Sequence, residues 1–416
     1  MSSVIKKPGA RKSVEQQSLA FQPSRAKTPG GALDAEELQT RAPGGSHEIA
    51  KPLLAWFRGA RRALPWRIDP RDPYKTWLSE VMLQQTRVET MVPYFHRFLA
   101  RFPTLQSLAE APQDDVLALW SGLGYYARAR NLHRAAQEAF AKHGALPKTL
   151  DELRALPGFG PYTSAAVASL AFGVDAALVD GNVARVLARA LGLEGDVDRA
   201  KLRSWELAPG LLLKGKAGEF NEALMELGAM ICTPRSPACS RCPIAEGCVA
   251  RERGNPEEVP AARPRKARPL VIRAALRLQR DDGRVLLQRQ PGGALFEGLW
   301  DLPALEVGAE DPDSVRAAAA KLGRELGAKG EPAYLARVEQ ALTHREMRVE
   351  IFALTTPKKD PAKDRPELRW ASQDKDALAL IGLSSLARKS LIASGSAALR
   401  SSRLLDTDAL GDKLPV

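Results

Sequence analysis

The sequence predicts a multidomain protein in which an all-α domain is followed, after a linker, by a smaller α+β domain. Three observations lead to this fold class. Apolar residues recur at helical spacing over residues 46–252, where no strand pattern competes with them. Four prolines then stand among basic residues in segment 253–269, which is typical of an interdomain linker. Alternation typical of strands begins only beyond that segment, in residues 270–394.

The elements can be placed in chain order between the breaks that proline and glycine make. Residues 1–45 combine basic residues with Ser, Gly, Pro and Gln, so we expect a disordered basic tail. The helical domain should contain helices at 114–120, 127–141, 149–156, 163–172 and 183–191. The α+β domain should contain a hairpin of 271–278 and 285–290, a helix at 313–326, strands at 334–343 and 348–354, and a helix at 384–392. Residues 395–416 should form a weakly structured tail.

The charge balance favours a polyanionic partner. The 416 residues include 61 Lys and Arg against 49 Asp and Glu, which gives a net charge of +12. Such an excess fits DNA or RNA, although a basic protein without a nucleic-acid partner shows the same balance. No window reaches the ~18 apolar residues of a membrane span, and the N-terminus lacks the apolar segment of a signal peptide. We therefore expect an intracellular protein with no membrane partner.

All four cysteines lie within one short stretch of the chain. Cys232, Cys239, Cys242 and Cys248 are separated by six, two and five residues. Four thiolates from one loop can converge on a single inorganic centre, whereas disulfides in a chain of this length would join distant segments. The spacing alone leaves a tetrahedral zinc ion and an iron-sulfur cluster equally open.

A glycine-rich connection between two predicted helices has the pattern of a helix-hairpin-helix. It runs Leu-Pro-Gly-Phe-Gly-Pro-Tyr-Thr over residues 156–163, after a helix that Thr149 and Glu152 begin with a capping box. Gly158 and Gly160 let the backbone turn tightly and expose N–H groups that can bind a DNA phosphate without sequence preference. The alternative is an ordinary connection between helices.

Two carboxylic acids are candidates for catalysis. Asp180 follows an apolar run and precedes Gly181, Asn182 and a helix, so either Asp180 or Asn182 could instead be a helix N-cap. Glu80 lies along the edge of an apolar stripe on a predicted helix, where partial desolvation should make it hold its proton more tightly. The alternative for Glu80 is a structural ion pair with Arg87.

These motifs together resemble the endonuclease III superfamily of DNA glycosylases, and within it the family that removes adenine opposite 8-oxoguanine. The resemblance covers roughly residues 50–390 and includes Glu80 in SEVMLQQT, the hairpin, Asp180 in VDGN and the cysteine loop, in the same order. It implies that Glu80 protonates adenine, at N7, and that Asp180 stabilises the cationic sugar, with Asn182 orienting Asp180 or water. Tyr162 occupies the position where bifunctional relatives carry a lysine nucleophile, which implies a monofunctional enzyme.

The same resemblance implies the cofactor and the residues that contact DNA. The four cysteines should hold a [4Fe-4S] cluster, and Leu123 and Tyr125 should be wedges around the oxidised guanine. The C-terminal domain resembles the Nudix-hydrolase fold but has only Asp313 and Glu325 as acids in its helix, so it should recognise the base and not hydrolyse pyrophosphates. Leu342, Thr343 and His344 stand where the family has Phe-Ser-His, a departure that affects the packing of that loop. The complete set expected to bind substrate or DNA is Trp66, Arg67, Gln85, Thr86, Leu123, Tyr125, Gly158, Gly160, Thr343 and His344.

The resemblance therefore predicts an adenine DNA glycosylase of base excision repair. Its partner should be double-stranded DNA with A opposite 8-oxoguanine or, more weakly, opposite guanine, and the protein should be a cytoplasmic, nucleoid-associated monomer. Two rival functions are a bifunctional pyrimidine-lesion glycosylase and a non-catalytic mismatch-binding protein. Tyr162 argues against the first, and the presence of both Glu80 and Asp180 argues against the second.

Overall fold

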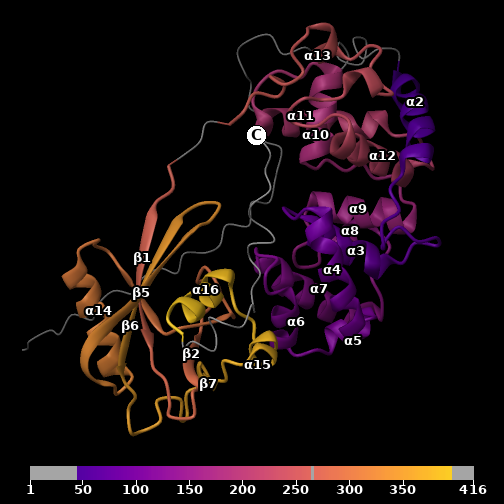
Figure 1. Cartoon of the computed structure of the whole chain (residues 1–416). Helices are drawn as coiled ribbons and strands as arrows, with labels where there is room; N and C mark the ends of the chain where they lie inside the picture. The colour runs from indigo at the N-terminus through magenta and orange to yellow at the C-terminus, as the bar shows by residue number, and fades with distance from the viewer. Residues whose placement is uncertain (1–44, 264–266, 396–416) are drawn as a thin grey trace, which may run out of the picture.

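A computed structural model describes residues 45–263 and 267–395, and it divides into a helical part and a part built on β-strands (Figure 1). Most of the predicted tails, residues 1–45 and 395–416, lie outside the described residues. No helix in the described ranges combines the length and the apolar character needed to cross a membrane. The helices of the first part are α2 (Gly45–Ala60), α3 (Pro73–Leu83), α4 (Val88–Arg101), α5 (Leu105–Ala109), α6 (Gln113–Trp120), α7 (Ala127–His143), α8 (Leu150–Arg154), α9 (Pro161–Phe172), α10 (Gly181–Leu191), α11 (Val197–Leu211), α12 (Ala217–Met230), the 3-10 helix η1 (Cys239–Arg241) and α13 (Val249–Glu252).

The predicted helices are confirmed, and capping residues mark their ends. Helices α6, α7, α9 and α10 agree with the predicted ranges to within a few residues. Asp180 begins α10, where its side chain accepts a hydrogen bond from the Val183 N–H at 2.7 Å. Gly192, with a φ of 66°, ends the same helix in the left-handed conformation. The N-cap hypothesis for Asp180 is therefore confirmed as well.

Helix α3 lies in the interior of the helical part. It contacts α4, α7 and α9, and nearly every residue from Tyr74 to Met82 is buried. Trp77 stacks on Phe159 of the hairpin, with ring centroids 5.1 Å apart. The predicted desolvation of Glu80 is confirmed and goes further than its expected place at the edge of an apolar stripe, since neighbours cover the polar side of α3 too. Glu80 is consequently only 4% exposed.

The C-terminal part has two sheets flanked by helices. Its strands are β1 (Leu270–Arg277), β2 (Val285–Arg289), β3 (Trp300–Asp301), β4 (Ala304–Val307), β5 (Lys329–Ala341), β6 (Glu346–Thr355) and β7 (Leu368–Ala371), and its helices are α14 (Pro312–Glu325), α15 (Lys375–Ala379) and α16 (Ser385–Ala393). One sheet has the order β4-β1-β6-β5 and the other the order β3-β2-β7. The predicted hairpin is confirmed next to its turn, where Gln279 and Val285 form an antiparallel bridge and the Leu286 N–H donates to the Leu278 carbonyl oxygen at 3.0 Å. Farther from the turn it was wrong, because β1 pairs with β4 and β6 whereas β2 pairs with β3 and β7.

The two parts meet at the turn that joins α6 to α7, with α15 close to α6 (Figure 1). The carbonyl oxygen of Leu383 accepts hydrogen bonds from the Ser121 hydroxyl at 2.6 Å and from the Tyr126 hydroxyl at 3.2 Å. Arg388 donates to the Ser121 hydroxyl oxygen at 2.9 Å. Leu299 of the C-terminal part is buried within the core of the helical part. The interface therefore combines polar contacts with an apolar residue that crosses it.

Candidate active site

A cleft of about 1070 Å³ opens in the helical part and gathers most of the predicted site. Its walls come from the segment before α3, the C-terminal end of α3, the hairpin, the beginning of α10, and α12. The predicted residues that line it are Trp66, Arg67, Glu80, Gln85, Thr86, Gly158, Gly160, Tyr162, Asp180 and Asn182. Residues more than a hundred positions apart in the sequence therefore surround one space large enough for a nucleoside.

Glu80 is a buried carboxyl whose hydrogen bond comes from a hydroxyl group. The Tyr162 hydroxyl donates to its Oε2 atom at 2.5 Å. Burial raises the pKa of Glu80 to about 7, and the charges of Glu222 and Asp180 add to that rise, whereas the Tyr162 hydrogen bond and the charge of Arg67 oppose it. The structure does not contain the ion pair with Arg87 that was the alternative for Glu80. The surroundings of Glu80 instead raise its pKa far enough for the side chain to donate a proton at neutral pH.

Asp180 is held differently, by the helix that it begins. Its Oδ1 accepts from the Val183 N–H, and its Oδ2 accepts from the Asn182 side-chain amide at 3.2 Å. Arg185 in turn donates to the Asn182 amide oxygen at 2.9 Å. Burial raises the pKa of Asp180 above its usual 3.8, but these hydrogen bonds and the Arg185 charge oppose the rise. The hydrogen bonds and the Arg185 charge therefore act in favour of the ionised carboxylate, against the effect of burial.

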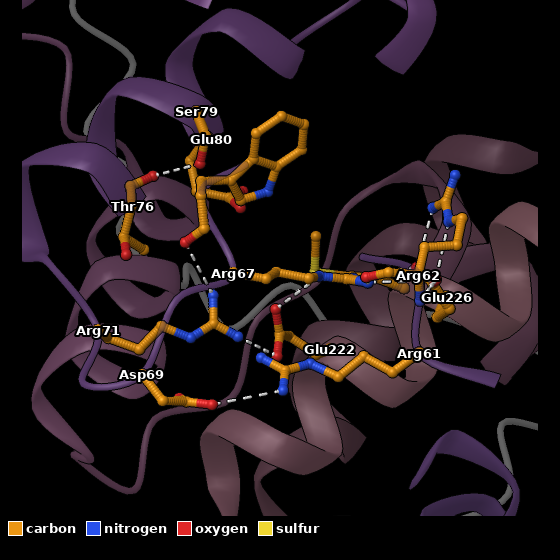
Figure 2. A network of polar contacts seen from close by, with 12 residues as sticks. Arg61, Arg62, Arg67, Asp69, Arg71, Thr76, Ser79, Glu80, Glu222 and Glu226 are labelled. Carbon is orange, nitrogen blue, oxygen red and sulfur yellow. Dashed lines mark hydrogen bonds and ion pairs between the residues drawn. The ribbon is translucent and has the colours of Figure 1, made fainter. Parts of the chain in front are cut away.

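Behind Glu80 lies a network of arginines and glutamates that the sequence interpretation missed, apart from Arg67 (Figure 2). Glu222 accepts from Arg67 Nε at 3.1 Å and from Arg71 at 2.6 Å. Glu226 accepts from Arg62 Nε at 2.8 Å and from Arg67 at 3.0 Å. Burial alone would raise the pKa of Glu226, but the bonds from Arg62 and Arg67 hold it at about 2. A signal existed in the sequence, since these two glutamates lie one turn apart on the apolar helix α12.

Trp66 lies both at the cleft and in the core of the helical part. It lines the cleft, and it is also only 3% exposed and packs edge-on against Phe95 with centroids 5.4 Å apart. Arg67 likewise faces the cleft while its guanidinium is bound by Glu222 and Glu226. Both residues therefore shape the wall of the cleft through groups that are already fixed in place.

The hairpin places backbone N–H groups at one rim of the cleft. Gly158 has a φ of 76°, and a Cβ atom there would lie 2.7 Å from the Asn131 Cβ atom, so this position requires glycine. Gly160 is the N-cap of α9, and the N–H groups of the first turn of any helix have no partner within the helix. Such a turn can accept a phosphate, as the helix-hairpin-helix hypothesis expects.

The predicted wedge residues differ in accessibility. Gln85 and Tyr125 are exposed and adopt left-handed backbone conformations, with φ values of 59° and 49°. Leu123 is only 7% exposed and packs in the core, so its prediction as a wedge does not fit this conformation. Sequence position alone could not show this, because burial of Leu123 depends on how the turn folds back on the helical core. Tyr126, the next residue, is buried and packs in the core of the helical part.

Thr343 and His344 lie in the turn between β5 and β6, far along the chain from the cleft residues. Both are exposed, and the turn is closed by the hydrogen bond from the Leu342 N–H to the Arg345 carbonyl oxygen at 2.8 Å. The hydroxyl oxygens of Thr343 and Tyr125 lie 2.5 Å apart. Leu342 is partly buried against the C-terminal core, so it packs where the family has an aromatic residue.

The four cysteines line one common cavity beside α10. All four are free and partly buried. Arg189 donates to the Cys232 sulfur at 3.4 Å, and Arg185 donates to its carbonyl oxygen at 2.8 Å. The donor set therefore fits an iron-sulfur cluster, which when bound would cross-link this loop and anchor it to the helix of Asp180.

Comparison with known proteins first defines the class. Residues 78–209 match the HhH-GPD superfamily of base excision DNA repair proteins, residues 232–248 match the iron-sulfur binding domain of endonuclease III, and residues 274–393 match the NUDIX domain. These matches confirm the predicted fold class and the [4Fe-4S] cofactor. They identify a base excision repair glycosylase with an iron-sulfur loop and a Nudix-like C-terminal domain.

The relatives then define the family. The adenine DNA glycosylase of Homo sapiens is 33% identical over 382 residues, which cover 77% of this chain and 70% of the human protein. The adenine DNA glycosylase of Schizosaccharomyces pombe is 37% identical over 319 residues, which cover 62% of this chain and 69% of the yeast protein. This chain belongs to the adenine DNA glycosylase family, and it is an enzyme that hydrolyses an N-glycosidic bond.

Solved structures also show likenesses. A thermostable thymine-DNA glycosylase is 31% identical, with a TM-score of 0.46 over 50% of this chain and 97% of that chain. A trapped covalent intermediate of endonuclease III with DNA is 23% identical, with a TM-score of 0.42 over 50% of this chain and 99% of that chain.

The cluster assignment predicts a spectroscopic result for Cys242→Ser. Loss of one thiolate should remove most of the visible absorbance and the bound iron, and should lower the thermal stability of the helical part. Absorbance spectra, iron content and thermal unfolding of purified protein measure these effects. Ser240→Ala, an exposed change in the same loop, is the matched control and should retain all three properties. A Cys242→Ser protein with full iron and absorbance would contradict the assignment.

Proposed function

We propose that this chain releases adenine from duplex DNA in which adenine faces 8-oxoguanine or, less readily, guanine, with Glu80 as the general acid. One observation carries the proposal: two carboxyl groups with different surroundings face the same cleft. Glu80 is buried under Tyr162 with a pKa of about 7, and Asp180 is held by hydrogen bonds at the beginning of α10. Pairs of acids that differ in this way divide the roles of acid and charged stabiliser.

The acid role follows from the leaving group. Neutral adenine leaves poorly, so it must accept a proton, at N7, as the bond to the sugar breaks. Because Tyr162 occupies Oε2 of Glu80, the other oxygen of that carboxyl can carry the proton toward the base. Glu80 has a proton to give at neutral pH because its pKa is raised.

The second carboxyl acts on the sugar. As adenine departs, the deoxyribose gains positive charge, which the Asp180 carboxylate stabilises or briefly bonds. Glu80, now deprotonated, can accept a proton from the attacking water. Asn182 holds Asp180 in place through its side-chain amide. Since none of these groups can reach a base within the stacked duplex, the adenosine must be flipped into the cleft.

The remaining parts of the chain have supporting roles in this proposal. Residues 46–252 form the catalytic domain, and residues 270–394, joined to it by the linker 253–269, recognise the opposite base. Thr343, whose hydroxyl lies beside Tyr125, is the group that we assign to the oxidised guanine, with His344 next to it. Gln85, Thr86 and the hairpin bind the duplex. We propose a monomer that associates with the nucleoid.

Glu80→Gln should separate binding from chemistry. The amide has the same shape but no acidic proton, so duplex binding should persist while adenine release falls by about 100- to 10,000-fold. Single-turnover excision and a binding titration on the same duplex measure the two effects. Glu219→Gln is the matched control, because Glu219 pairs with Arg58 outside the cleft. Normal turnover by Glu80→Gln would refute the acid role and also the claim that Glu80 distinguishes an enzyme from a binding protein.

The raised pKa of Glu80 predicts the pH dependence of the chemical step. The reactive form is protonated, so with a pKa of about 7 half of the enzyme is active at pH 7. With the ordinary glutamate pKa of 4.5, only ~0.3% of Glu80 would be protonated at pH 7. The single-turnover rate constant should therefore approach a plateau as the pH falls below 7, over the range in which Asp180 is ionised, and should fall about tenfold per pH unit well above pH 7. Measurements at saturating enzyme give the profile, and a rate that rises through pH 7 would show that the acid form is not the active one.

Tyr162 predicts that no covalent adduct with DNA forms through an imine. A phenol has no amine to attack the sugar, so borohydride should trap nothing when the enzyme acts on its mispair. Denaturing gels of the reaction with labelled DNA provide the measurement. Endonuclease III, for which a trapped covalent intermediate with DNA has been solved, is the positive control. An adduct formed in proportion to adenine release would favour the bifunctional rival.

A further inference from the structure

Two turns that the proposed function assigns to DNA carry an unusual backbone. Gln85 follows the end of α3, and Tyr125 follows the end of α6. Both are non-glycine residues in the left-handed conformation. Such residues hold that conformation only where their surroundings fix it. The contacts of both turns therefore show what keeps them in place.

One guanidinium contacts both turns. Arg128, in the first turn of α7, donates through one terminal nitrogen to the carbonyl oxygens of Val81, Met82 and Gln84 at 2.8, 3.0 and 2.6 Å. Through its other terminal nitrogen it donates to the carbonyl oxygens of Leu123 and Gly124, each at 3.2 Å. The planar fork of arginine suits this, since its two ends can serve two separate segments.

The bonds fall on the peptides that set the two unusual conformations. The carbonyl group of Gln84 belongs to the peptide that leads into Gln85, and that of Gly124 belongs to the peptide that leads into Tyr125. A carbonyl group held in place fixes the peptide plane before the next residue, and φ of that residue is measured relative to this plane. Arg128 therefore restrains both residues at once.

Arg128 makes these contacts in an unusual setting for a charged group. The hydrogen-bond acceptors that the structure gives it are backbone carbonyls and, at 3.5 Å, the Thr86 hydroxyl. Burial lowers the pKa of Arg128 to about 10, which still leaves it charged at neutral pH. Its guanidinium also lies 5.3 Å from the Trp120 ring and 5.6 Å from the Tyr125 ring. The negative end of the α3 helix dipole offsets part of the cost of burying the charge.

We propose that Arg128 is a positioning residue that joins the turn of residues 84–86 and the turn of residues 123–126 into one rigid wedge, which occupies the duplex while adenine is extruded. This inference rests on the proposed function, because only an enzyme that flips its base needs such a wedge. Arg128 does not line the cleft that contains the Glu80 and Asp180 carboxyl groups. It acts by keeping Gln85 and Tyr125 at a fixed separation and orientation before DNA binds.

The test uses Arg128→Lys in the full-length protein, because lysine keeps the charge but cannot donate to both turns. Two duplexes are compared: one with adenine opposite 8-oxoguanine, and one with adenine in a single-nucleotide bulge, where no opposite base has to be displaced. Single-turnover excision should fall at least about tenfold on the paired duplex and stay within about threefold of wild type on the bulge. The pH at which the rate begins to fall should not move, since Glu80 keeps its surroundings.

Controls separate this role from folding. Arg134→Lys, an exposed change on the same helix, should behave as wild type on both duplexes. An equal loss on paired and bulged adenine, with or without loss of the cluster absorbance, would overturn the proposal, because it would mean a general defect. Wild-type rates for Arg128→Lys on the paired duplex would also overturn it. If the wild-type protein releases no adenine from either duplex, the proposed function itself has failed.

Discussion

Burial of the Glu80 carboxyl is the constraint on which the rest of the site depends. Removing a charged carboxylate from water costs several kcal/mol unless it is paired or takes up a proton. The arginines near Glu80 are bound to Glu222 and Glu226, and the hydrogen bond to Glu80 comes from the uncharged Tyr162. Burial of Glu80 without a cationic partner therefore favours its protonated form. The same packing that places Glu80 in the interior thus raises its pKa, as the proposed acid role requires.

Asp180 combines the structural role of a helix N-cap with the chemical role that we propose for it. Its two oxygens are used by Val183 and Asn182, so it begins α10 and cannot rotate freely. These bonds and the nearby helix terminus favour its charged form, even though burial acts in the opposite direction. The two carboxyls therefore lie in one cleft with different surroundings: Glu80 accepts from the Tyr162 hydroxyl, whereas Asp180 accepts from a backbone N–H and an amide. The N-cap hypothesis was correct and did not compete with the catalytic one.

What could be predicted from the sequence was mostly local. Three features depend only on residues that are close in the sequence: the helix-hairpin-helix turn, the capped helix at Asp180 and the cysteine loop. Their spacing was therefore enough to locate them along the chain. The network of Arg67, Arg71 and Glu222 joins residues about 150 positions apart, and periodicity carries no information on such a pairing. The same limit explains why a turn at Gly283 was predicted correctly while the strands beside it join different sheets.

The turn between α6 and α7 joins the two parts of the chain, and in our proposal it links base extrusion to recognition of the opposite base. Ser121 and Tyr126, at its two ends, donate to the same carbonyl group of Leu383 in the C-terminal part. Tyr125, between them, is exposed and reaches Thr343. A shift of the C-terminal part would therefore move the turn itself, because both ends of the turn are tied to it. The way the two parts dock therefore also determines the position of this turn.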